Sequence, residues 1–141
     1  MDSRGECKQI SVEAKLENLE RVNEFVEYCL KDRDCSAKVK MQLELVVEEI
    51  FTNIANYAYG GNVGNVTIEG SLVDGTAKFK LKFMDRGVPY NPLERPDPDI
   101  NAGIADRPVG GLGIDLVKKN VDDVTYQHKD GQNILTIEKI I

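Results

Sequence analysis

The chain of 141 residues has the length of one domain, so we expect residues 1–141 to form a single domain with no separate substrate domain. Its 18 basic and 24 acidic residues give a formal net charge of −6, which disfavours nucleic acid and anionic membrane surfaces as partners. Hydrophobic residues at 41% and charged residues at 30% are typical of a globular protein, and they exclude a disordered acidic chain.

The first part of the chain predicts one strand and two helices. Residues 8–14 alternate roughly between polar and apolar side chains, which indicates a short strand. Apolar residues recur at steps of three and four over residues 17–31, which predicts an amphipathic helix. Ser36 can accept a hydrogen bond from a free backbone N–H group, so it is the expected N-cap of a second helix over residues 37–57.

The rest of the chain predicts two hairpins with a helix between them. Each hairpin has an Asp-Gly turn between two segments with strand patterns. The expected elements are strands over 66–72 and 77–84, a helix that opens at 110–113 and ends near 120, and strands over 124–128 and 133–140. Consecutive hairpins favour a mostly antiparallel, mixed sheet, and amphipathic helices need a sheet face to cover. We therefore expect an α+β fold, a two-layer α/β sandwich with three helices on one face of the sheet.

A long loop is expected between the two hairpins. Residues 86–110 contain all five prolines of the chain and almost no regular periodicity. A loop of this length inside a compact domain is usually functional or disordered.

The cysteines and the histidine exclude several kinds of site. Cys7, Cys29 and Cys35 lack the paired spacing of zinc and redox motifs, so we expect reduced thiols. The single histidine, His128, removes most Ser-His-Asp and multi-histidine metal chemistry. Without a signal peptide or an apolar run long enough to span a bilayer, the chain is expected to be cytoplasmic. Any catalysis must depend on carboxylates or on a bound ligand.

Two polar side chains lie at the edge of the apolar stripe of the second helix. Glu49 and Asn53 are four residues apart and so share one flank of that helix. They can reach a cleft from this position, but a solvated helix border explains the same pattern.

Asp85 is the strongest candidate for a binding residue. The alternation of the preceding strand places it on the apolar face, where an unpaired charge is costly to bury. Its partner could be the backbone of a turn at Asp85-Arg86-Gly87, or a ligand. A carboxylate at such a strand end can accept a hydrogen bond from an exocyclic amine, as in adenine recognition.

A glycine run, Gly110-Gly111-Leu112-Gly113, precedes the third expected helix. Bare backbone N–H groups at a helix start attract phosphate, although a loop that needs positive dihedral angles explains the glycines equally well. The run is not a Walker A loop, because no Gly-Lys-Ser/Thr follows it.

The Glu49–Asn53 pair, Asp85 and the glycine run occur along the chain in the same order as three sequence motifs of a known family. The segment EIFTNIANYAY at 49–59 resembles the N box of the histidine-kinase-like ATPases, DRGVPYNP at 85–92 resembles their G1 box, and GLG at 111–113 resembles their G2 box. Within that superfamily the small size and the segment GGLGIDLVKKNVDDVTY are most similar to bacterial anti-sigma-factor serine kinases.

The resemblance assigns roles to the candidate residues. It implies that Asn53 coordinates a Mg²⁺ ion that bridges the phosphates, that Glu49 is the general base, and that Asp85 holds the adenine amino group. Residues 93–110 would be the ATP lid. The other implied ATP-binding residues are Gly87, Tyr90, Arg107, Gly110, Gly111, Leu112 and Gly113.

The chain departs from the family pattern at three positions. Tyr57 stands where many relatives in the kinase group have a histidine. Arg107 is the nearest counterpart of the expected lid arginine, but a proline and a valine separate it from Gly110. A threonine often found early in the last strand has its register occupied by Ile134, with Thr136 two residues on. These departures bear on kinase activity more than on nucleotide binding.

The function that the resemblance implies is an ATP- and Mg²⁺-dependent serine/threonine protein kinase. Such a kinase phosphorylates a small antagonist protein, binds a sigma factor and forms a homodimer. The alternative is a nucleotide-gated regulatory binding module without phosphotransfer, and a third reading is an ATPase fragment that serves a partner in trans. A sensor kinase is disfavoured, because His128 falls in an expected strand rather than in an acceptor helix.

Overall fold

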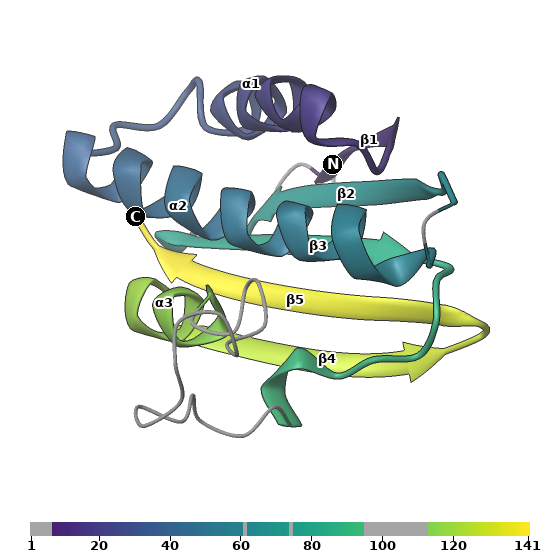
Figure 1. Ribbon diagram of the computed structural model, residues 1–141. Coiled ribbons are helices and arrows are strands. Elements are labelled where there is room, and N and C mark those ends of the chain that lie inside the picture. Colours follow the sequence, from purple (N-terminus) through teal and green to yellow (C-terminus); the bar gives the residue numbers. More distant parts are fainter. Residues whose placement is uncertain (1–6, 61, 74, 95–112) are drawn as a thin grey trace, which may run out of the picture.

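The fold has a helical layer packed on one face of a sheet (Figure 1). The structure, a computed structural model, describes residues 7–60, 62–73, 75–94 and 113–141. The strands are β1 (Cys7–Glu13), β2 (Asn65–Leu72), β3 (Lys78–Asp85), β4 (Asp123–Lys129) and β5 (Gln132–Ile140). The helices are α1 (Leu19–Cys29), α2 (Ala37–Asn53) and α3 (Gly113–Asn120).

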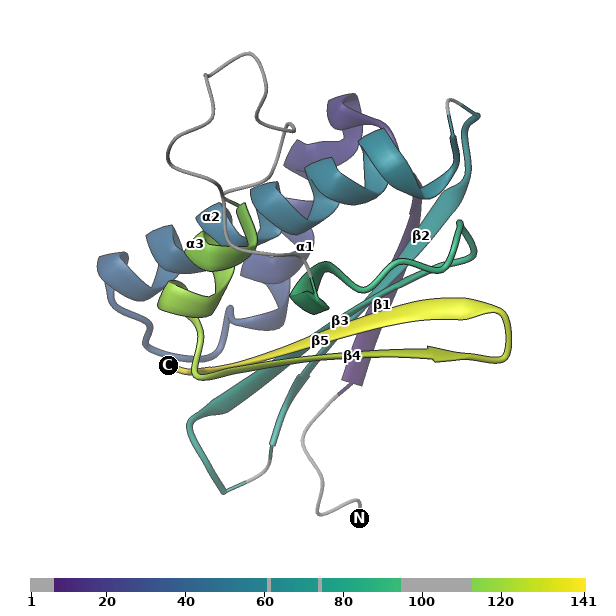
Figure 2. The ribbon, with the colours of Figure 1, turned by 60° about the horizontal axis from the view of Figure 1, so that its bottom comes forward.

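The sheet has the strand order β1-β2-β3-β5-β4, and each of these pairings is antiparallel. Figure 2 shows that α1, α2 and α3 all lie on the same side of it. The α+β two-layer architecture expected from the sequence is therefore confirmed. Within the described strands the sheet is antiparallel throughout, although the sequence also allowed a mixed sheet.

Strand β3 shows how the alternation of side chains builds the core. Phe79, Leu81 and Phe83 are almost fully buried. Lys80 and Lys82, which alternate with them, are only half-buried. Since successive side chains of a strand point to opposite faces, the apolar set faces the helices and the lysines face outward. The same parity places Asp85 on the buried face, as the sequence predicts.

Local signals for caps and turns are confirmed. The Ser36 hydroxyl accepts a hydrogen bond from the backbone N–H of Val39 at 3.1 Å, which caps α2. Asp130 and Gly131 both have positive φ angles, at 55° and 77°. These angles are those of a two-residue type I′ hairpin turn, which the right-handed twist of the two strands favours.

The end of α2 differs from the prediction. The sequence predicts a helix to Tyr57, but the α-helix ends at Asn53 and a π-helical turn, η2 (Ile54–Ala58), follows. The carbonyl of Ala58 accepts a hydrogen bond from Val88 N at 2.8 Å, so the loop that follows β3 contacts the end of this turn. Periodicity along one segment cannot reveal a contact of this kind. π-Turns are frequent at functional sites.

No helix within the described ranges is both long and apolar enough to cross a membrane.

Candidate functional site

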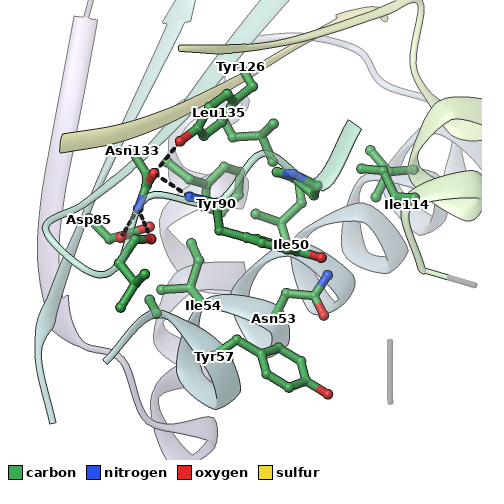
Figure 3. A pocket seen from close by; sticks show the side chains of 15 residues that line it. Ile50, Asn53, Ile54, Tyr57, Asp85, Tyr90, Ile114, Tyr126, Asn133 and Leu135 are labelled. Carbon is green, nitrogen blue, oxygen red and sulfur yellow. Dashed lines mark hydrogen bonds between the residues drawn. The ribbon is translucent and has the colours of Figure 1, made fainter. Parts of the chain in front are cut away.

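A pocket lies between the end of α2, the end of β3, the start of β5 and α3 (Figure 3). Its apolar walls come from both layers of the fold, and they include Ile50, Ile54, Phe83, Ile114, Val117 and Leu135. Its polar lining consists of Asn53, Tyr57, Asp85, Tyr90, Tyr126 and Asn133. A mostly apolar cavity with a few placed polar groups is the usual form of a small-molecule site.

Asp85 is the buried carboxylate of this pocket. It is 5% exposed at the end of β3. Its Oδ1 atom accepts hydrogen bonds from the Gly87 backbone N–H at 2.9 Å and from Asn133 Nδ2 at 2.9 Å. The turn partner that the sequence suggested is therefore present. Asp85 also lines the cavity, so the turn does not remove it from contact with a ligand.

Asn133 is one polar pocket residue that the sequence reasoning missed, and Tyr126 is another. Asn133 is 6% exposed and pairs with Asp85 across β5 and β3. Ile134, the next residue of β5, pairs with Met84. A signal was present in the sequence, because Asn133 has the same parity in its strand as the buried Leu135 and Ile137. A polar residue on the apolar face of a strand is unusual enough to mark a site.

The loop after β3 lies tightly against η2. A Cβ atom on Gly87 would be 2.1 Å from the Ala58 carbonyl oxygen and 2.5 Å from its carbon. Val88 N donates to the same oxygen at 2.8 Å. Any side chain at Gly87 would push this loop away from the helix. The position therefore needs a glycine to bring the loop backbone close to η2.

Tyr59 connects the same loop to β2. Its hydroxyl accepts a hydrogen bond from Arg86 N at 3.0 Å and donates one to the Asn65 carbonyl. Its ring packs where a side chain at Gly64 would lie. Tyr59 therefore fixes the end of the helical layer relative to the strand ends that carry Asp85.

Glu49 and Asn53 differ in their relation to the pocket. Asn53 lines it, whereas Glu49 is one helical turn earlier and is not part of the described lining. Partial burial raises the pKa of the Glu49 carboxyl, and the charge of the neighbouring Glu48 raises it further. Glu49 is thus a carboxylate whose basicity is greater than that of an ordinary exposed glutamate.

The remaining expected site residues fall into two groups. Tyr90 lines the pocket, and its backbone N–H donates to Asn133 Oδ1 at 3.2 Å. Gly113 is the first residue of α3. Most of the expected lid, residues 95–110, lies outside the described residues. Four of the expected ATP-binding residues also lie outside the described residues: Arg107, Gly110, Gly111 and Leu112.

The described residues contain no cluster of three or more histidine, cysteine or carboxylate side chains that could hold a metal ion. A magnesium ion does not need such a cluster, because it commonly keeps several waters and binds through one or two protein oxygens together with substrate phosphates. The amide oxygen of Asn53, at the wall of the pocket, has the chemistry for that role.

Comparisons with known proteins agree with this geometry. Residues 12–139 match the family model of the histidine kinase-like ATPase domain. The chain is 30% identical over 102 residues to the serine-protein kinase RsbW of Bacillus cereus, a match that covers 70% of this chain and 62% of that relative. It is 29% identical over 109 residues to the serine/threonine-protein kinase BtrW of Bordetella bronchiseptica, which covers 77% of this chain and 75% of that one. The match thus spans less than two thirds of RsbW.

Solved structures share the fold at lower sequence identity. The RsbU and RsbW domains of Rv1364c from Mycobacterium tuberculosis superpose with a TM-score of 0.66 at 14% identity, over 95% of this chain and 32% of that one. The histidine kinase domain of a blue-light activated kinase from Erythrobacter litoralis gives a TM-score of 0.55 at 18% identity, over 88% and 59% of the two chains. Because the family model covers nearly the whole chain and the fold agrees with it, the chain belongs to the histidine kinase-like ATPase family.

Proposed function

We propose that this chain is an ATP-binding serine/threonine protein kinase of the anti-sigma-factor type. In this proposal it phosphorylates a small antagonist protein and binds a sigma factor. The observation that carries it is the buried Asp85 carboxylate in an apolar pocket that Asn53 also lines. The names of the similar kinases RsbW and BtrW support the protein-kinase part.

The pocket has the chemistry that adenine requires. Ile50, Ile54 and Leu135 offer apolar walls for a flat ring. At the buried end, Asp85 offers a carboxylate oxygen, which accepts a hydrogen bond from an exocyclic amino group. Gly87 keeps the neighbouring backbone free of side-chain bulk. Tyr90 closes part of the same wall.

The phosphate end of the nucleotide would lie toward α2 and the start of α3. The Asn53 amide oxygen would hold Mg²⁺, which neutralises phosphate charge when it is bound. Gly113 and the glycines before it, with Leu112, would present backbone amides to the phosphates, and Arg107 would add a positive charge from the lid.

Glu49 would act as the general base. In the transfer step, a serine or threonine hydroxyl oxygen of the substrate protein bonds to the γ-phosphorus, its proton passes to Glu49, and ADP is the leaving group. The raised pKa of Glu49 suits this role, because a base is most effective when its pKa lies close to the working pH. Glu49 does not line the pocket wall, so the substrate hydroxyl would approach from the flank of α2.

The finer features belong to the same proposal. They are a single domain over residues 1–141, a lid over 93–110, a homodimer, a role in transcription regulation and a cytoplasmic location.

A second candidate function is a nucleotide-gated binding module without phosphotransfer. Two observations favour it: Glu49 does not line the pocket, and Tyr57 replaces a histidine that many kinase relatives have. In such a module the nucleotide would stabilise one of two states and so change the affinity for a partner protein.

Phosphotransfer assays separate the two candidates. The purified chain with Mg²⁺ and γ-labelled ATP is incubated with the small antagonist-like proteins encoded beside its gene, as wild type and as Glu49→Ala. The kinase proposal expects a labelled serine or threonine with wild type and a large loss with Glu49→Ala. Absence of label on every neighbour, together with partner capture that differs between ATP and ADP, would support the module instead.

Nucleotide binding by calorimetry tests the assignment of roles. Asp85→Asn should weaken ATP binding strongly, because an amide can turn a donor toward the adenine amino group. Glu49→Ala should leave ATP affinity nearly unchanged, because Glu49 acts on the attacking hydroxyl. The reverse order of effects would refute both assignments.

A further inference from the structure

Asn133 makes all of its hydrogen bonds within the protein. A side-chain amide has two N–H donors and two acceptor positions on its oxygen. Asn133 Nδ2 donates to Asp85 Oδ1 at 2.9 Å and to the Val88 carbonyl at 3.0 Å. Asn133 Oδ1 accepts from Tyr90 N at 3.2 Å and from the Tyr126 hydroxyl. The amide therefore has no capacity left for a ligand, although it lines the pocket (Figure 3).

These partners also fix the orientation of the amide. Its nitrogen faces three acceptors: the Asp85 carboxylate, the Val88 carbonyl and, at 3.5 Å, the Gly87 carbonyl. Its oxygen faces two donors. Exchange of the two atoms would set donor against donor at Tyr90 N and acceptor against acceptor at Asp85. A fully satisfied buried network has a single low-energy arrangement.

The network determines which oxygen of Asp85 can meet a ligand. Among the described residues, Oδ1 accepts from both Gly87 N and Asn133 Nδ2. A carboxylate oxygen has about two acceptor positions, so this atom is filled. Oδ2 has no hydrogen-bond partner among the described residues, so Asp85 would offer a base one free oxygen rather than two.

A single acceptor distinguishes adenine from guanine. Adenine presents one amino group beside a ring acceptor, and one carboxylate oxygen satisfies it. Guanine presents two parallel donors, a ring N–H and an amino group, which match the two oxygens of a free carboxylate. A carboxylate with one oxygen filled leaves one guanine donor buried without a partner, and such a group is costly.

We infer that Asn133 is a positioning residue that makes the pocket select adenine over guanine nucleotides, by filling Oδ1 of Asp85. This inference rests on the proposed nucleotide-binding function. It concerns a side chain of β5, opposite Asp85, to which the resemblance assigns no role.

The test compares the affinities of a non-hydrolysable ATP analogue, AMPPNP, and its guanine counterpart, GMPPNP, by calorimetry with Mg²⁺. Wild type should prefer AMPPNP. Asn133→Leu has a similar size but no donor, so the preference should fall by about tenfold. Loss of stability alone would lower the affinities for AMPPNP and GMPPNP equally and leave the ratio of the two affinities unchanged. Asn62→Leu, the same change at an exposed position, should leave the ratio unchanged.

A second variant covers the case in which Asn133→Leu does not fold. Tyr126→Phe removes one of the two donors that fix the amide oxygen. The preference for AMPPNP should then fall in the same direction by about threefold. An unchanged ratio in a folded Asn133→Leu protein overturns the inference, and so does an unchanged ratio in Tyr126→Phe if only that variant folds.

The outcomes for wild type separate this inference from the proposed function. Wild type that binds neither nucleotide refutes the function itself. Wild type that binds AMPPNP and GMPPNP equally well overturns the selectivity inference but leaves nucleotide binding in place.

Discussion

Gly87→Ala is expected to impair both stability and nucleotide binding through one steric contact. The added Cβ atom would lie 2.1 Å from the Ala58 carbonyl oxygen. The obstacle is backbone, so no rotamer change can relieve the contact, and the loop after β3 must move. Overpacking of this kind costs about 1–3 kcal/mol. For a chain of 141 residues that corresponds to a fall in melting temperature of about 3–10 °C.

The same movement should weaken ATP binding, because the loop carries the Gly87 N–H that donates to Asp85. Differential scanning calorimetry with and without ATP measures both effects. Gly75→Ala is the matched control, since Gly75 has a φ of +75° and open space around it. In that variant, backbone strain should lower the free energy of unfolding by about 1 kcal/mol, and the ATP affinity should stay unchanged. If Gly87→Ala melts within 1 °C of wild type, the close approach at Ala58 is not a constraint and the reasoning is wrong.

Three further variants test other contacts of the site. Asn53→Ala should abolish the difference between ATP affinity with Mg²⁺ and in EDTA, measured by calorimetry, and a retained difference would assign the metal to other groups. Glu48→Gln removes the like charge that helps raise the pKa of Glu49. Because a base works only when deprotonated, the phosphotransfer rate should fall as the pH is lowered through the pKa of Glu49. In Glu48→Gln this fall should occur at a lower pH. The control Glu44→Gln should leave the pH dependence unchanged. Tyr59→Phe leaves Arg86 N without its partner, so thermal denaturation should show that the free energy of unfolding falls by about 1–3 kcal/mol. A melting point equal to that of wild type would show that this hydrogen bond does not stabilise the fold.

The sequence predicts the layers of this protein well, because the relevant signals are local. Alternation along β3 places Asp85 on the buried face without any knowledge of the strand partners. The Ser36 cap and the Asp130-Gly131 turn also follow from residues that are neighbours in the chain. Strand parity and turn chemistry act over a few residues, so they can be read from one segment at a time.

The features that the sequence does not predict depend on contacts between distant segments. The pairing of Asp85 with Asn133 joins residues 48 positions apart, and a shift of one residue would have put Ile134 opposite Asp85. The π-turn at Ile54–Ala58 likewise ends at a residue that accepts a hydrogen bond from Val88, which lies beyond two strands. Periodicity gives the face on which a side chain lies but not its partner across the sheet. Register between strands 48 residues apart therefore requires the assembled structure.

The candidate site is divided between the two layers of the fold, so its geometry depends on the hydrogen bonds that join the layers. Asp85, Gly87 and Asn133 lie at the sheet, whereas Glu49 and Asn53 belong to α2. The hydrogen-bonding groups proposed for the base and for the phosphates of a nucleotide would thus come from different layers. Their separation depends on contacts that cross between the layers at this end, which include the Val88–Ala58 and Arg86–Tyr59 hydrogen bonds. Both crossing donors are backbone N–H groups of the loop that directly follows Asp85. The carboxylate proposed to bind the base and both crossing donors lie within residues 85–88, so we expect a disturbance of this loop to affect both the sheet side and the helical side of the pocket.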